Sequence, residues 1–176
     1  MMAPMGAQIN IINVLLAVDT VAILKTADSG TGTPANPVYV DESTLWMVTR
    51  QADAVFGNGT AELKLTAQTE DLIRWRGISL SLNGNHSVIF YKFQPMRPNT
   101  DILLSPPVPL VIEIESALPN PANLTTPNRQ TLKDYFYETT VEQAGETVYA
   151  LDFMIVDRNG QIEGYFSWDP FIQITD

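Results

Sequence analysis

The sequence predicts an all-β protein, namely a single-domain antiparallel β-sandwich over residues 1–176, with a jelly-roll or immunoglobulin-like layout and at most one or two short helical turns. Short segments alternate between apolar and polar residues, as strands do when one face is buried. Glycine and proline separate these segments, and no long apolar stripe of helical period is present. With 45% hydrophobic residues, a chain of this length has the size of one domain with a core.

Eight segments carry the strand pattern. They are residues 10–17, 45–50, 61–67, 72–82, 86–93, 110–115, 147–156 and 161–174. The alternation is clear in 61–67, where Leu63 and Leu65 share one face while Glu62 and Lys64 share the other. Such a segment is expected to be a half-buried strand.

Turn residues predict two hairpins. The "NGN" at 83–85 is expected to pair the segments on its two sides, with Gly84 at the positive φ of a tight turn. Asn159-Gly160 is expected to join the last two strands in the same way.

The last hairpin is expected to be a core element. Phe153 and Ile155 share one face of its first strand, and Phe166 and Trp168 share one face of its second. Pro170 interrupts the second strand. Because proline cannot donate to a ladder, this end is expected at an edge or a bulge.

Two segments favour short helical turns. One is "VDTVAILKT" at 18–26, capped by Asp19, and the other is "NRQTLKDYFYET" at 128–139. The proline-rich segments "ADSGTGTPANP" and "SPPVPLVIEIESALPNPANLTTPN" are interpreted as ordered loops or edge segments.

Composition argues against several functions. Cysteine is absent, which rules out disulfides, a thiolate nucleophile and cysteine zinc sites. The net charge is −10 and the basic residues form no cluster, so nucleic acid is not an expected partner. No apolar run reaches the roughly 20 residues of a membrane span, and the N-terminal segment lacks the basic region of a signal peptide. A cytoplasmic protein without a cofactor is expected.

No catalytic or metal site is predicted. His86 is the only histidine and is interpreted as an exposed turn residue, and no "GxSxG" elbow occurs. In "DRNGQIE", Asp157, Asn159 and Glu163 are close enough to consider calcium, but the spacing of an EF-hand is missing. Turn chemistry is the preferred interpretation, and the protein is not expected to be an enzyme.

The string "EDLIRWRG" suggests a first ligand-binding site. In an extended strand Arg74 and Arg76 share a face with neighbouring apolar residues, so their guanidinium groups need partners. Either they pair with Asp71, Glu70 or a distant acid, or they form a carboxylate or sugar site beside Trp75.

The string "EGYFSWDPF" suggests a second site. Tyr165, Ser167 and Asp169 point one way, while Phe166 and Trp168 point the other way, toward the expected core. A tyrosine beside an aspartate offers a stacking surface and a hydrogen-bond acceptor, which sugar binding uses. Alternatively, Asp169 only caps the turn before the proline.

Several longer strings carry a family resemblance: "INVLLAVDT", "IRWRGISLSLN", "VIFYKF", "LLSPPVPLVIEI", "LPNPAN", "QTLKDYFYETT" and "FMIVDRNGQIEGYFSWDPFI". Together they resemble the bacterial PixA/AidA inclusion body protein family, from about Ile11 to Ile174. The resemblance implies a cytoplasmic protein of host-associated bacteria, under quorum-sensing or phase-variation control in some members, that can accumulate as crystalline inclusions. It implies no catalytic residues. The inclusion-forming members are methionine-rich, whereas this chain has 6 methionines.

Two classes of function follow. The first is a non-catalytic protein that self-associates as a homo-oligomer through edge strands or an apolar patch. The second is a lectin-like module that binds a carbohydrate or small ligand. The candidate ligand-binding residues are Arg74, Trp75, Arg76, Tyr165 and Asp169.

Overall fold

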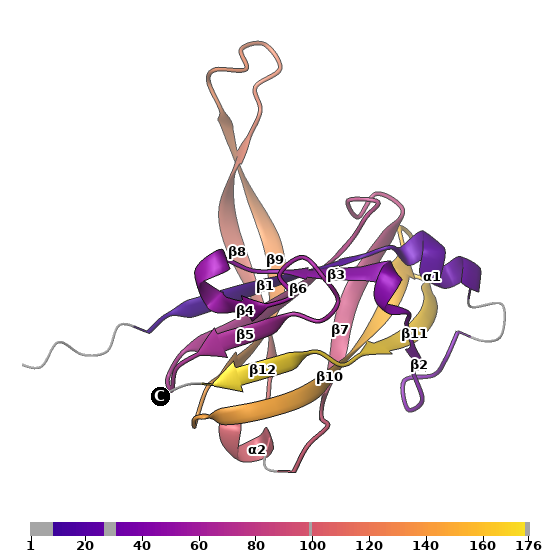
Figure 1. Ribbon diagram of the computed structural model, residues 1–176. Coiled ribbons are helices and arrows are strands. Elements are labelled where there is room, and N and C mark those ends of the chain that lie inside the picture. Colours follow the sequence, from indigo (N-terminus) through magenta and orange to yellow (C-terminus); the bar gives the residue numbers. More distant parts are fainter. Residues whose placement is uncertain (1–8, 27–30, 99, 175–176) are drawn as a thin grey trace, which may run out of the picture.

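Two β-sheets pack face to face in the computed structural model, which describes residues 9–26, 31–98 and 100–174 (Figure 1). Within these residues, one sheet has five strands in the order β3-β1-β6-β9-β8. The other has seven, in the order β2-β11-β10-β12-β5-β4 with β7 paired to β10. The predicted all-β sandwich is therefore confirmed.

The strands of the five-stranded sheet are β3 (Leu45–Val48), β1 (Ile11–Val18), β6 (Leu72–Ser79), β9 (Asn128–Thr140) and β8 (Val108–Leu118). Those of the seven-stranded sheet are β2 (Val38–Tyr39), β11 (Ile162–Trp168), β10 (Gly145–Asp157), β12 (Phe171–Ile174), β5 (Lys64–Ala67), β4 (Ala54–Phe56) and β7 (His86–Pro95). The helices are α1 (Thr20–Thr26) and α2 (Thr100–Leu103), with 3-10 turns at Glu42–Thr44 and Gln51–Asp53. Among the described residues, none of these helices has the length and hydropathy that crossing a membrane requires.

Most strand pairs are antiparallel, as expected, but three pairs in the described part of the chain are parallel. They are β1 with β6, β2 with β11, and β5 with β12. Each joins segments that are distant along the chain, which a short hairpin turn cannot do.

The core lies between the sheets and follows the predicted alternation. In β1, Ile12, Val14, Leu16 and Val18 are buried. Strand β10 differs, because residues on both of its faces are buried. At its centre the Tyr149 hydroxyl accepts a hydrogen bond of 2.8 Å from the Trp75 indole of β6, so the two sheets are joined through their middle strands.

The predicted hairpin around 83–85 is wrong. β6 pairs with β1 and β9, whereas β7 pairs with β10, so residues 80–85 carry the chain from one sheet to the other. The left-handed residues in this connection are Leu82 and Asn83, with φ of 53° and 60°, rather than Gly84. The segment that was predicted to end at residue 82 leaves the sheet after Ser79.

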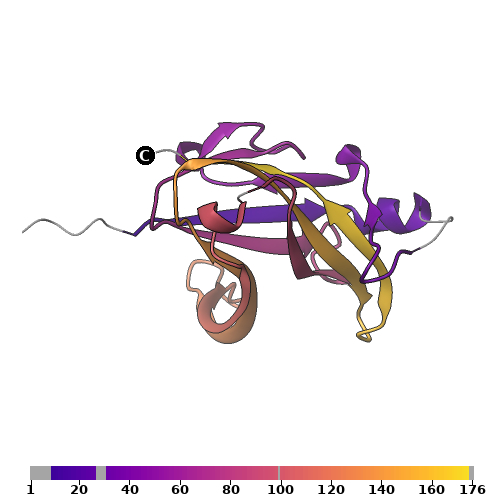
Figure 2. The same ribbon diagram turned by 90° about the horizontal axis from the view of Figure 1, so that it is seen from below.

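The predicted helical turn at 128–139 is also wrong, because these residues form the 13-residue strand β9. Its pairing with β8 runs from Val108 opposite Glu138 to Leu118 opposite Asn128. The outer part of this hairpin extends beyond the other strands as a projecting arm in Figure 1, and Figure 2 shows the same arm nearly end-on. Long cross-strand pairing therefore outweighs the weak helical signal of the segment.

The terminal hairpin is confirmed. β10 pairs with β11 across a turn in which Gly160 has φ of 81°, and Phe166 and Trp168 are buried. Asp169 and Pro170 separate β11 from β12, as expected for an interrupted strand. The strand β12 itself is not an edge, because it lies between β10 and β5.

The predicted turn at 18–26 is helix α1. The Asp19 carboxylate accepts a hydrogen bond of 2.9 Å from the backbone N–H of Ala22, which is the capping role assigned to it.

A side chain of β9 contacts the edge of β7 at one point. The Tyr135 hydroxyl donates to the backbone oxygen of Val88 at 2.6 Å, and burial raises the pKa of Tyr135 to about 12. Close to this point Gly77 of β6 meets Val88, and a Cβ at Gly77 would lie 2.7 Å from Val88 Cγ1.

We expect Gly77→Ala to lower the free energy of unfolding by about 1–3 kcal/mol, because the added methyl group overpacks the contact with Val88. Val88→Ala leaves a cavity but removes part of this clash, so the double variant should lose less stability than the two single variants combined. Urea unfolding of all three variants measures the coupling. Strictly additive losses would contradict the proposed contact.

We expect Trp168→Ala to cost about 3–5 kcal/mol of stability, as truncation of a large core aromatic does. Its indole N–H also donates to the Ala61 carbonyl at 2.9 Å. Trp168→Phe keeps most of the apolar area and is the matched control, with a smaller expected loss. Equal losses for both variants in thermal and urea unfolding would assign the effect to the hydrogen bond alone.

Candidate functional site

The five candidate ligand-binding residues do not form one site. Trp75 lies in the core with no exposed surface, packed against Tyr149 and Phe93 at ring-centroid distances of 5.3 and 6.1 Å. Arg74 and Arg76 lie on the opposite side of β6, which points away from the core, because side chains alternate along a strand. Trp75 is therefore not available to stack on a ligand that the two arginines bind.

Both arginines pair with acids of β9. The Arg74 Nε–Glu138 Oε2 distance is 2.5 Å, and the Arg74 guanidinium lies 5.6 Å from the centre of the Phe136 ring. Arg76 forms an ion pair with Asp134, whose side chain is buried. Of the partners considered from the sequence, the structure selects a distant acid in each case.

A shallow groove lies on the side of the five-stranded sheet that points away from the core. Its volume is about 510 Å³, and the residues that line it include Leu15, Val48, Arg74, Arg76 and Phe136. Leu15 and Val48 are 37% and 42% exposed. We call these five residues the outer face. It combines apolar side chains with arginines whose charges are already balanced.

Tyr165 and Asp169 lie elsewhere, on β11 and just after it. The Tyr165 ring packs edge-on against Tyr91 at 5.6 Å. Between the two candidates, the Ser167 hydroxyl is fully buried and donates to Asp152 Oδ1 at 2.7 Å. The expected polar face of this strand thus contains a buried polar pair, which sequence reasoning did not find.

Asp169 lies in the strand break, close enough to Glu62 for its charge to act on that carboxyl group. Burial is the main cause that raises the pKa of Glu62, and the nearby charge of Asp169 raises it further. This arrangement concentrates negative charge at the break and offers no hydrogen-bond donor from either side chain.

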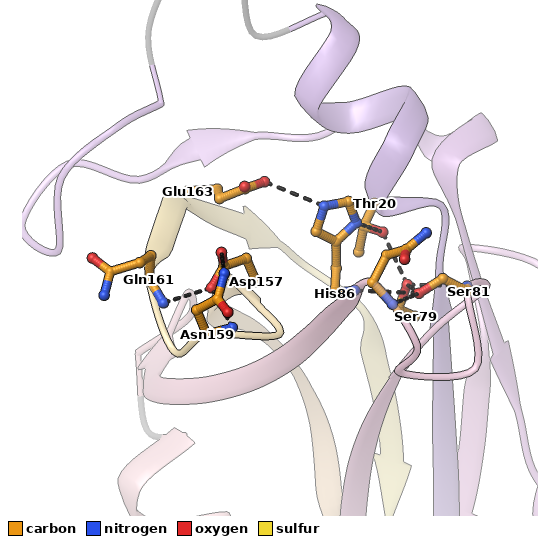
Figure 3. A network of polar contacts seen from close by, with 9 residues as sticks. Thr20, Ser79, Ser81, His86, Asp157, Asn159, Gln161 and Glu163 are labelled. Atoms are coloured by element: carbon orange, nitrogen blue, oxygen red, sulfur yellow. Dashed lines mark hydrogen bonds and ion pairs between the residues drawn. The ribbon is translucent and has the colours of Figure 1, made fainter.

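His86 is not the exposed turn residue that the sequence suggested, since only 17% of its side chain is exposed. Figure 3 shows it between Glu163, with an Nε2–Oε2 distance of 3.3 Å, and Thr20, with an Nδ1–Oγ1 distance of 3.0 Å. The chain of contacts continues to Ser79 at 2.9 Å and from there to Ser81 at 2.9 Å. The network connects α1, β6, β7 and β11.

The order carboxylate, imidazole and hydroxyl resembles that of a catalytic triad. A nucleophile must reach its substrate, however, and Thr20 is only 1% exposed. The contacts of the network connect α1 and the end of β6 to the seven-stranded sheet. In the sequence, the signal for this network is that "SLS" and "HS" lie close together on the two sides of residues 82–85. Such a pair of strings has no distinctive spacing.

Asp157 and its neighbours form a turn, as the preferred interpretation of "DRNGQIE" held. The Asp157 carboxylate accepts from the backbone N–H groups of Asn159 and Gln161, each at 2.8 Å. Glu163 points away from it toward His86 (Figure 3). Within the described ranges no group of His, Cys, Asp and Glu side chains is placed to hold a metal ion.

We expect Asp157→Ala to lower the melting temperature in a pH-dependent way. The hydrogen bond from Gln161, followed by those from Asn159, lowers the pKa of Asp157 below its ordinary value of 3.8. The carboxylate therefore contributes stability above about pH 4, and this contribution is lost as the pH falls through the lowered pKa.

Thermal melts between pH 7 and pH 2.5 check this expectation. The difference between wild type and Asp157→Ala should be largest at pH 7 and should shrink in acid. Glu142→Ala, at an exposed position, is the control. A difference that stays constant with pH would show that the ionised carboxylate is not the stabilising form.

Comparison with known proteins gives a consistent family match. The family model described as PixA, inclusion body protein, matches residues 10–174. The crystal structure of the PixA inclusion body protein from Burkholderia cenocepacia J2315 superposes with a TM-score of 0.79 at 20% sequence identity, covering 98% of this chain and 100% of that chain.

Other comparisons carry little weight. The match to the solution structure of amebosin covers 71% of this chain and 93% of that chain, with a TM-score of 0.26 and 7% sequence identity. No curated protein matches the chain.

Proposed function

This chain belongs to the PixA family of inclusion body proteins, and from this premise we propose that it is a non-catalytic cytoplasmic protein whose copies self-associate through the outer face of the five-stranded sheet. Accumulation of such assemblies as inclusions is part of the same proposal. The single observation that carries it is the exposed apolar surface of Leu15 and Val48 in a groove beside Phe136. Contiguous exposed apolar surface of this kind is typical of protein contact sites.

The charges on the outer face support burial against another copy. Unpaired charges are costly to desolvate, whereas Arg74 and Arg76 already have Glu138 and Asp134 as partners. A second copy therefore needs to supply no counter-ion. Arginine and aromatic residues are also enriched at the centres of protein interfaces.

The sheet edges are less suited to self-association. The long free edge is β8, but Pro109 cannot donate a ladder hydrogen bond, and Glu113 and Glu115 are exposed along it. Antiparallel pairing of two β8 strands around this acidic segment would bring like charges together, which natural edge strands use against aggregation. The edge of β7 is occupied at one point, where the Tyr135 hydroxyl donates to the backbone oxygen of Val88.

The non-catalytic part of the proposal is supported by the polar network. The hydroxyl that contacts His86 belongs to Thr20, which a substrate cannot reach. Both nitrogens of the imidazole already have partners, Thr20 and Glu163.

Carbohydrate binding is the weaker candidate. The ring that could stack on a sugar at the arginine site, Trp75, is buried, and Tyr165 already packs edge-on against Tyr91. The role in host-associated or quorum-sensing-regulated physiology that the family resemblance implies stays a prediction.

We expect the wild-type protein to have a solution mass of at least twice 19.5 kDa, since two-fold closure is the commonest form of self-association. Val48→Glu places a charge in the proposed contact and should shift the mass to that of the monomer. The matched control is Val21→Glu, an exposed valine on α1, which should assemble like wild type. Light scattering after size exclusion, over a hundredfold range of concentration, measures all three.

Circular dichroism and thermal melts first establish that both variants fold. A wild-type mass of one chain at every concentration would contradict the proposal. So would equal assembly of Val48→Glu and Val21→Glu, because the contact would then lie on another surface.

A further inference from the structure

A cavity separate from the outer face lies between β7 and the chain that leads into β8. Its volume is about 260 Å³. Phe93 and Pro95 of β7, Pro106 and Pro107 before β8, and Tyr137 of β9 supply much of its wall. These are flat, rigid and mainly apolar side chains, and the size is near the lower end for small-molecule pockets. A single ring with one substituent fits such a space.

The Tyr137 hydroxyl is a polar group at this cavity that has no hydrogen-bond partner among the described residues. The residue is only 8% exposed. Burial and the charge of Asp152 raise the pKa of Tyr137, and among the described residues no hydrogen bond to its hydroxyl contributes. Every fully buried side-chain nitrogen or oxygen of the described residues does have a partner. The hydroxyl must therefore keep some exposed surface, and the cavity that Tyr137 lines is where a ligand can reach it.

The charges around the cavity favour a neutral ligand. Lys92 lines the cavity, and its Nζ lies 4.0 Å from the Asp152 carboxylate, which is fully buried. The Asp152 carboxylate also accepts hydrogen bonds from Ser167 and Gln94. An anion near Tyr137 would meet the negative field of Asp152, and a cation would meet the ammonium of Lys92 and the apolar wall.

We propose that this cavity binds a small neutral aromatic molecule with one hydrogen-bond acceptor, such as an aryl ketone, to which the Tyr137 hydroxyl donates. The ring of the ligand packs against Phe93 and the two prolines, because aromatic rings pair favourably with such surfaces. This site does not depend on self-association, since none of its residues belongs to the outer face.

The test uses fluorine NMR titration of the full chain with 4-fluoroacetophenone. Fluorobenzene lacks the acceptor, 4-fluorobenzoate is an anion and 4-fluorobenzylammonium is a cation. The ketone should bind most tightly. Tyr137→Phe should weaken the ketone about five- to tenfold, to the level of fluorobenzene, while fluorobenzene itself binds unchanged, as loss of one hydrogen bond implies.

The matched control is Tyr135→Phe on the same strand. Its hydroxyl has a protein partner, Val88, so this change should lower the melting temperature and leave ketone binding unchanged. Tyr137→Phe should do the reverse and keep the melting temperature within about a degree, because no hydrogen bond is lost in the free protein. Amide shifts on adding the ketone should centre on Phe93, Leu104 and Ser105.

Several results would overturn the proposal. A ketone preference that survives in Tyr137→Phe would remove the hydroxyl from the site, and shifts centred on other residues would move the site. Binding of either ion as tightly as the ketone would contradict the charge argument. The titration is repeated with Val48→Glu, the variant that should not self-associate. Ketone binding should be the same in this variant as in wild type, because the cavity is separate from the outer face.

Discussion

The hydrogen bond from the Trp75 indole to the Tyr149 hydroxyl is the contact on which the rest of the sandwich depends. It joins the middle of the five-stranded sheet to the middle of the seven-stranded sheet, and both residues have no exposed surface. If the sheets shifted, two buried polar atoms would lose their partner, at a cost far above that of a solvent-exposed hydrogen bond. Phe93, which lines the cavity beside β7, stacks on Tyr149 with the ring centroids 5.0 Å apart. The same contact therefore also positions a wall of that cavity.

With the sheets held in this way, β6 has an aromatic side chain on the side that faces the core and charged side chains on the other side. Trp75 packs inward, while Arg74 and Arg76 on either side of it pair with acids of β9. The acids that neutralise the face are supplied by the strand that continues into the projecting arm. The same strand directs Tyr137 to the cavity on the inner side. The assembly surface and the ligand site that we propose are therefore opposite faces of one element.

The polar network around His86 stabilises the connection at residues 80–85, where the chain crosses from one sheet to the other. A connection of this kind has few ladder hydrogen bonds, so side chains must hold it. Ser81 accepts from the backbone N–H groups of Asn85 and His86, and Ser79 continues the contacts to Thr20. Residues that resemble catalytic groups thus stabilise a loop and the start of α1.

The sequence by itself determined the sandwich class, the cap of α1, the β10–β11 hairpin and the family, because these depend on alternation and turn residues that are neighbours in the chain. It did not determine β9, whose two faces both carry apolar and charged residues, nor β2 and β4, which are too short for a period to show. It placed Arg74 and Arg76 on one face but could not choose their partners. Only the tertiary structure decided which acids pair with them, that Trp75 is inaccessible and that the Tyr137 hydroxyl has no partner among the described residues. Those outcomes depend on contacts between residues many positions apart, which local periodicity does not record.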